Sequence, residues 1–146
     1  MEDEKFYICY TDDDPDDLLT FKDAAETVSA ALKVKTQNNG EDLIGLLKAG
    51  APLPKLIFLD LNMPGKTGFE ILKEIREAEE IKDIPVVIFS TSDNKQNILK
   101  SREMGANLYM PKPWDFVALK NAIRYDISIK WDTFQPSADN FVYKAT

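Results

Sequence analysis

Hydrophobic and polar positions follow two alternating patterns along this chain. Short apolar runs of strand length are separated by stretches in which apolar residues recur at helical spacing. The run 56–59 is apolar at four successive positions, which is typical of a strand buried on both faces of a parallel sheet. The predicted strands are 6–10, 33–36, 56–59, 84–89 and 108–110; the predicted helices are 15–32, the stretch between Asn39-Gly40 and Gly50, 67–80, 95–104 and 115–130.

Strand and helix therefore alternate five times, with short connections and no hairpin signal. This order predicts an α/β fold in which a parallel sheet is covered by helices on both faces. A length of 146 residues fits one domain. We place that domain at residues 1–130 and interpret residues 131–146 as a C-terminal tail, too short for an output domain, whose aromatic side chains pack on the body or on a second subunit.

Composition excludes several classes of protein. The net charge of −7 argues against a nucleic-acid-binding surface. No apolar run approaches the roughly 20 residues of a membrane span, and the acidic N-terminus is unlike a signal peptide. We therefore expect a cytoplasmic protein that binds neither nucleic acid nor membrane. The single cysteine, Cys9, lies in a predicted strand, where we expect it to be part of the core.

The chain contains no histidine. A Ser-His-Asp triad, a histidine metal site and a phosphohistidine on this chain are therefore excluded. Acid–base or phosphoryl chemistry here must use carboxylates, Lys, Ser or Thr and a metal ion, or a histidine from a partner.

Acidic residues are dense after the first predicted strand, with five aspartates in the six positions 12–17. Asp14, Asp16 and Asp17 are explained by a helix that begins at Pro15, because a cap and the first turn favour carboxylates. Asp12 and Asp13 precede that cap. Adjacent carboxylates at a strand end repel each other unless a cation joins them, and oxygen ligands suit Mg²⁺.

The carboxyl ends of parallel strands meet at one edge of the sheet, where open α/β sheets bind their ligands. Besides the aspartate pair, that edge would hold Asp60, Ser90 and Lys112. With Mg²⁺, this set can receive a phosphoryl group. Asp60 would be the nucleophile, Ser90 would donate to one phosphoryl oxygen, and Lys112 would pair with another.

At these residues the sequence resembles the receiver domain of bacterial two-component response regulators, the CheY-like family. The resemblance covers roughly residues 5–130 and rests on the order and spacing of Asp12-Asp13, Asp60-Leu61-Asn62-Met63-Pro64-Gly65, Ser90, Tyr109 and Lys112-Pro113. It implies the flavodoxin-like fold with strand order 2-1-3-4-5, which is the order given for CheY itself in general accounts of this fold. The segment 12–17 is also similar to the start of stand-alone regulators that pair with bacteriophytochrome-type kinases.

The resemblance implies that Asp60 accepts a phosphoryl group from the phosphohistidine of a sensor kinase or a histidine phosphotransfer protein. It implies Mg²⁺ bound by Asp13, Asp60 and the backbone carbonyl of Asn62, with Asp12 acting largely through water. Beyond this phosphoryl transfer and dephosphorylation we expect no enzymatic turnover. Output would be binding to a downstream protein, and a homodimer stays open.

Further roles follow from the same resemblance. Ser90 and Lys112 would contact the phosphoryl group, and Tyr109 would change rotamer with it, altering the face formed by the fourth helix, the last strand and the last helix. The Lys112–Pro113 bond would be cis, which X-Pro bonds tolerate. Taken alone, Tyr109 could be an ordinary strand aromatic.

Two other functions fit part of this residue set. A Mg²⁺-dependent aspartyl-phosphate phosphatase also uses a strand-end Asp, but it needs a second Asp two residues later, where this chain has Asn62. A phosphorylation-independent adaptor is the other alternative; such proteins typically lose a site residue, and none is lost here.

Overall fold

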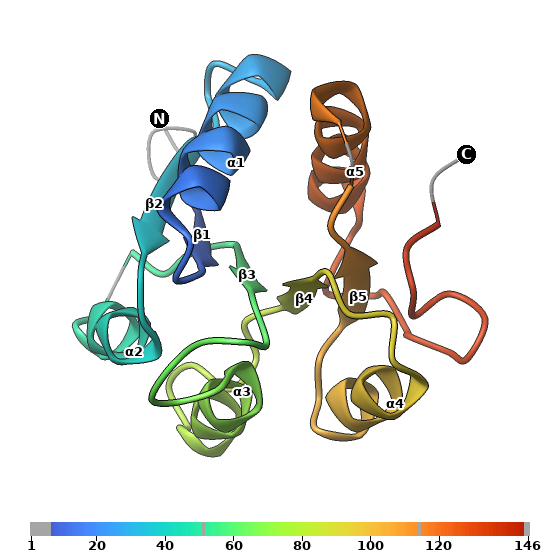
Figure 1. Ribbon diagram of the computed structural model, residues 1–146. Coiled ribbons are helices and arrows are strands. Elements are labelled where there is room, and N and C mark those ends of the chain that lie inside the picture. Colours follow the sequence, from blue (N-terminus) through green and yellow to red (C-terminus); the bar gives the residue numbers. More distant parts are fainter. Residues whose placement is uncertain (1–6, 51, 114, 145–146) are drawn as a thin grey trace.

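The sheet is formed by five parallel strands. A computed structural model describes residues 7–50, 52–113 and 115–144 (Figure 1). The strands are β1 (Tyr7–Thr11), β2 (Lys33–Gln37), β3 (Leu56–Leu59), β4 (Val86–Ser90) and β5 (Leu108–Pro111). Their order is β2-β1-β3-β4-β5, so the predicted α/β class and strand order are confirmed.

Five helices cover the two faces of the sheet. They are α1 (Pro15–Val28), α2 (Gly40–Lys48), α3 (Gly68–Glu77), α4 (Lys95–Glu103) and α5 (Phe116–Ser128). Helices α1 and α5 lie on one face, and α2, α3 and α4 lie on the other (Figure 1). Every position of β1, β3 and β4 is buried, as in a parallel sheet covered on both faces, and all but the terminal Thr11 and Ser90 are apolar.

Two apolar clusters form the core, one on each face. Under α1 and α5 the rings of Tyr10, Phe21, Phe58 and Phe89 pack with centroids 4.4 to 6.2 Å apart. On the opposite face, α2 and α3 contribute leucine and isoleucine side chains. Cys9 is buried in this second cluster, as expected.

Helix starts follow from local side-chain chemistry. Asp14 caps α1 and accepts hydrogen bonds from the backbone of Asp16 and Asp17. Thr67 caps α3, where its side chain and that of Glu70 form a reciprocal capping box. Caps of this kind satisfy backbone N–H groups that have no partner within the helix.

Two boundary predictions were wrong. The first helix was predicted to continue to residue 32, but α1 ends at Val28 because Ser29 is extended, with φ −153° and ψ 126°. The third helix was predicted to continue to residue 80, but α3 ends at Glu77 because Ala78 is extended, with φ −94° and ψ 116°.

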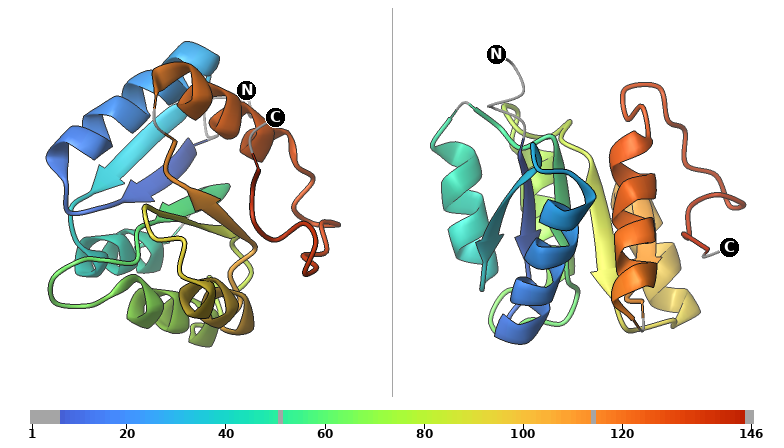
Figure 2. Two further views of the ribbon diagram at one scale, coloured as in Figure 1. Left: turned by 45° about the vertical axis from the view of Figure 1, so that its right-hand side comes forward. Right: turned by 90° about the horizontal axis from the view of Figure 1, so that it is seen from above.

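Within the described residues, the segment after α5 packs on the domain. Packing on the domain was one of the two arrangements predicted for its aromatic side chains. The indole N–H of Trp131 donates to the backbone carbonyl of Asp126 at 3.1 Å, and its ring packs on Phe134. Further along, Phe141 is buried and Tyr143 is half-buried. Figures 1 and 2 show this segment on the β5 side of the molecule, beside α5.

Among the residues that the structure describes, no helix has both the length and the apolar composition to cross a bilayer.

Candidate functional site

Asp60 occupies the centre of the carboxyl edge of the sheet. It follows β3 directly, and its backbone N–H donates to the Thr11 carbonyl of β1 at 3.0 Å. Asp60 is 5% exposed, so its carboxylate is buried beneath the loops at this edge of the sheet. This is where the sequence pattern placed it.

Three carboxylates meet at this point. One oxygen each from Asp12, Asp13 and Asp60 can be chosen so that all three lie within 4.8 Å of one another. Asp12 and Asp60 are buried, whereas Asp13 is exposed. Like charges this close, two of them removed from water, favour a divalent cation with oxygen ligands. The predicted gathering of these three side chains is confirmed.

Lys112 supplies positive charge from the end of β5. Its Nζ lies 2.6 Å from Asp12 Oδ2, 2.9 Å from Asp17 Oδ2 and 3.9 Å from Asp60 Oδ1. Burial opposes the ammonium form, but the hydrogen bonds to Asp12 and Asp17 outweigh it, so the pKa of Lys112 is raised. The lysine therefore stays charged and points into the acidic site.

Burial raises the pKa of Asp60 to about 7. The charge of Lys112 and a hydrogen bond from the Asn62 backbone N–H lower it, while the charges of Asp12 and Asp13 raise it. Near neutral pH the ionised Asp60 is thus short of compensating positive charge. A cation or an additional donor at this position is therefore electrostatically favoured.

Ser90 and Tyr109 line the β4–β5 side of the site. Ser90 is fully buried at the end of β4, and its Oγ accepts from the Ser92 backbone N–H at 3.2 Å. Tyr109 is also fully buried, and its hydroxyl donates to the Ser92 carbonyl at 2.8 Å. The two side chains thus meet at one loop, the β4–α4 connection.

Sequence reasoning missed two members of this cluster. Asp17 was assigned to the helix N-terminus alone, but its carboxylate also pairs with Lys112. Tyr10 was interpreted only as a strand residue, but its hydroxyl donates to Asp12, and burial together with this bond raises the pKa of Tyr10. Asp17 lies in the first turn of α1, which begins at the same edge of the sheet as Asp12, and this position was the signal that could have identified it.

Asn62 lies exposed in the loop after β3, beside Asp60. The predicted use of its carbonyl as a ligand and the predicted cis bond before Pro113 stay predictions.

Fold and site together define a class of protein. A five-stranded parallel sheet in this order, with three carboxylates, a buried serine and a lysine at its carboxyl edge, is the arrangement of phosphorylatable signalling domains. Residues 8–124 match the family model described as the response regulator receiver domain. The chain belongs to this family, whose members generally bind Mg²⁺ at the acidic pocket and interact with histidine kinases and downstream targets.

Similar proteins support the same conclusion. The response regulator Rcp1 of Synechocystis sp. is 45% identical over 62 residues, which is 42% of this chain and 42% of Rcp1. The two-component response regulator ARR17 of Arabidopsis thaliana is 36% identical over 94 residues, which is 58% of this chain and 61% of ARR17. The chain thus spans less than two thirds of these two curated relatives.

Solved structures match over a longer range. The Mn²⁺-bound form of response regulator Rcp1 has a TM-score of 0.75 at 28% identity, covering 91% of this chain and 99% of that one. The phosphorylated cyanobacterial phytochrome response regulator RcpA has a TM-score of 0.77 at 30% identity, covering 90% and 96%.

Proposed function

We propose that this chain is a response regulator that accepts a phosphoryl group on Asp60 from a phosphohistidine and signals by phosphorylation-controlled protein binding. The observation that carries this proposal is the buried Asp60 carboxylate, surrounded by the oxygens of Asp12 and Asp13 and by Lys112 Nζ at 3.9 Å. Phosphoryl transfer needs positioning and charge neutralisation more than covalent help, and this set supplies both.

In the proposed step an Asp60 carboxylate oxygen attacks phosphorus. The P–O bond of an acyl phosphate forms, the P–N bond breaks, and its electron pair stays on the imidazole nitrogen of the partner. Lys112 pairs with a phosphoryl oxygen, and the Ser90 hydroxyl donates to another. The signal ends by hydrolysis. Water attacks phosphorus, the Asp60 carboxylate leaves, and inorganic phosphate and a proton are released.

The donor set fits Mg²⁺. Asp12, Asp13 and Asp60 would hold it together with the Asn62 carbonyl, and the ion would neutralise the transferred oxygens. Because Asp60 has a pKa of about 7, protons compete with the cation, so cation affinity falls as the pH drops below this value.

We also propose that the phosphodonor is a phytochrome-type histidine kinase, or a phosphotransfer protein acting with one. This rests on the similarity to RcpA, which is described as a phytochrome response regulator, and on the acidic segment 12–17.

Intact-mass analysis with acetyl phosphate tests the central proposal. We expect one added phosphoryl group on the wild type with Mg²⁺, at least tenfold less without it, and none on Asp60→Asn. Asp139→Asn, a change at an exposed carboxylate of the C-terminal segment, is the matched control and should behave as the wild type. An adduct of equal yield on Asp60→Asn, or no adduct on the wild type, would contradict the proposal.

A further inference from the structure

The outer edge of β5 is occupied by the chain's own C-terminal segment. Tyr109 donates its backbone N–H to the Phe141 carbonyl at 2.8 Å, and the Tyr143 N–H donates to the Tyr109 carbonyl at 2.8 Å. Tyr109 and Val142 thereby form a parallel bridge. An exposed edge strand is a template for pairing with another chain, and here residues 141–143 use the groups of Tyr109 that such a partner would need.

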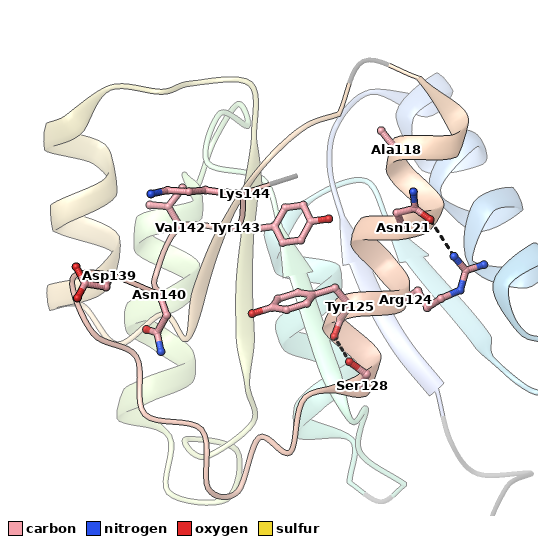
Figure 3. A pocket seen from close by; sticks show the side chains of 10 residues that line it. All are labelled: Ala118, Asn121, Arg124, Tyr125, Ser128, Asp139, Asn140, Val142, Tyr143 and Lys144. Carbon is pink, nitrogen blue, oxygen red and sulfur yellow. Dashed lines mark hydrogen bonds between the residues drawn. The ribbon is translucent and has the colours of Figure 1, made fainter. Parts of the chain in front are cut away.

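Aromatic side chains fix this segment on both sides of β5. Phe141 is 2% exposed and packs beside Tyr109, with ring centroids 6.5 Å apart. Tyr143 packs on Tyr125 of α5 at 5.1 Å (Figure 3). A turn closed by Asn140, whose Oδ1 accepts from the Ser137 N–H at 2.6 Å, directs the segment back to the sheet. The docking is therefore specific.

The docked segment also creates a groove. Residues of α5 form one wall, and residues 139, 140 and 142–144 form the other, around a volume of about 620 Å³ (Figure 3). Since one wall belongs to the segment, the groove exists only in the docked state.

Tyr109 connects the segment to the acidic site. Its hydroxyl donates to the Ser92 carbonyl at 2.8 Å, and the Ser92 N–H donates to Ser90 Oγ at 3.2 Å. Burial raises the pKa of Tyr109, whereas its hydrogen-bond contacts with Ser90 and Ser92 lower it. The backbone of the same tyrosine holds the segment.

We propose that residues 137–143 are an internal ligand of the β5 edge and that their docking is strengthened by phosphorylation of Asp60, with Tyr109 as the coupling residue. This inference rests on the proposed function. Phe141 is buried beside the Tyr109 ring in its inward position, so the docked segment packs against the inward ring. A phosphoryl group that takes the Ser90 hydroxyl as donor removes Ser90 from the Tyr109 side and favours the same inward ring.

Docking of the segment and phosphorylation of Asp60 favour the same position of the Tyr109 ring, so each stabilises the other. The coupling is reciprocal. If phosphoryl-mimic binding at Asp60 strengthens docking of the segment by some factor, the docked segment strengthens that binding by the same factor. A partner that pairs with the β5 edge would have to displace the segment, whereas a partner that uses the groove would need it docked.

Amide hydrogen exchange measured by NMR tests the coupling directly. The amides of Tyr109 and Tyr143 are the donors of the two docking hydrogen bonds. We expect beryllofluoride with Mg²⁺, a phosphoryl mimic, to slow exchange at both amides by about fivefold or more, which is the lower end of typical coupling. Unchanged exchange at both amides, with beryllofluoride bound, overturns the inference and leaves the proposed function intact. No acyl phosphate on Asp60 and no beryllofluoride binding overturns both.

The reciprocal arm uses Phe141→Ala in the full chain. It should speed exchange at Tyr109 and Tyr143 and weaken beryllofluoride affinity by the factor found above. Asp132→Ala, an exposed position outside residues 137–143, should match the wild type. An affinity equal to that of the wild type counts against the coupling. The wild-type measurement is repeated at two protein concentrations, because protection that rises with concentration would mean that a second copy supplies the segment and would overturn an internal ligand.

Discussion

Asp126 is a buried carboxylate whose side chain makes none of the contacts described at the phosphoryl site. It lies on the buried side of α5, fully inaccessible, and neither side-chain oxygen has a hydrogen-bond partner among the described residues. Burial raises the pKa of Asp126 well above 3.8. The folded protein therefore binds the Asp126 proton more tightly than the unfolded chain does.

We expect Asp126→Asn to raise the melting temperature at pH 7 by roughly 2–4 °C, which corresponds to about 1 kcal/mol for a chain of this size. The folded state binds the Asp126 proton more tightly, so stability falls as pH rises above 3.8. The amide cannot ionise and avoids this cost. The advantage of the variant should shrink as the pH is lowered toward 4.

Thermal unfolding followed by circular dichroism at pH 4, 5.5 and 7 measures this difference. Asp139→Asn, at an exposed site, serves as the control and should show no such trend. A constant offset between Asp126→Asn and the wild type at all three pH values would contradict an ionisation effect.

At the scale of elements, the β3–α3 connection determines where Asp60 lies. The Gly68 N–H donates to the Leu61 carbonyl at 3.0 Å, which folds the start of α3 back onto the end of β3. A Cβ at Gly68 would contact the Asp60 carbonyl oxygen and lie 2.7 Å from the Leu61 Cα. Both are backbone atoms, so the loop itself would have to move.

Gly68→Ala should therefore lower the free energy of unfolding by about 1–3 kcal/mol through overpacking. Because the displaced backbone carries Asp60, phosphorylation by acetyl phosphate should slow by roughly tenfold or more. Urea unfolding and the time course of the intact-mass adduct measure the two effects.

Gly45→Ala is the matched control within a helix. A Cβ at Gly45 meets nothing within 4 Å, so alanine should stabilise α2 by about 0.5–1 kcal/mol and leave the rate unchanged. Equal phosphorylation rates in Gly68→Ala and Gly45→Ala would mean that the close approach at Gly68 does not position Asp60.

At the scale of the whole molecule, Arg76 of α3 joins two connections, α3–β4 and α4–β5, at the edge of the sheet opposite to the site. Its guanidinium donates to the carbonyls of Lys82, Ile84 and Gly105 and to Asn107 Oδ1, at 2.8 to 2.9 Å. Asn107 Oδ1 also accepts from the Val86 N–H at the start of β4. One side chain of α3 thus orders the entries to β4 and β5.

Replacing this guanidinium should weaken the whole domain. We expect Arg76→Met to reduce the free energy of unfolding by about 2–4 kcal/mol, because several partly buried acceptors lose their donors at once. Urea unfolding by circular dichroism measures it. Arg124→Met on the exposed side of α5 should stay within about 0.5 kcal/mol of the wild type. Equal losses in the two variants would argue against a special role for Arg76.

Local patterns in the sequence determined most of the fold and the centre of the site. Runs of apolar residues mark strands whatever the rest of the chain does, and helical spacing marks the helices between them. Since parallel strands end at one edge, Asp12, Asp60, Ser90 and Lys112 could be assigned to one site from their positions in the sequence.

Tertiary structure alone decided which further side chains reach that site and which surfaces stay open. The pairing of Asp17 with Lys112 depends on how α1 is rotated against the sheet, and the pairing of Tyr109 with Phe141 joins segments far apart in the chain. The burial of Asp126 and the exposure of Phe116 likewise depend on what packs against α5. Spacing along a chain specifies the local conformation of a segment, whereas rotation, edge pairing and burial depend on neighbours that only the folded molecule supplies.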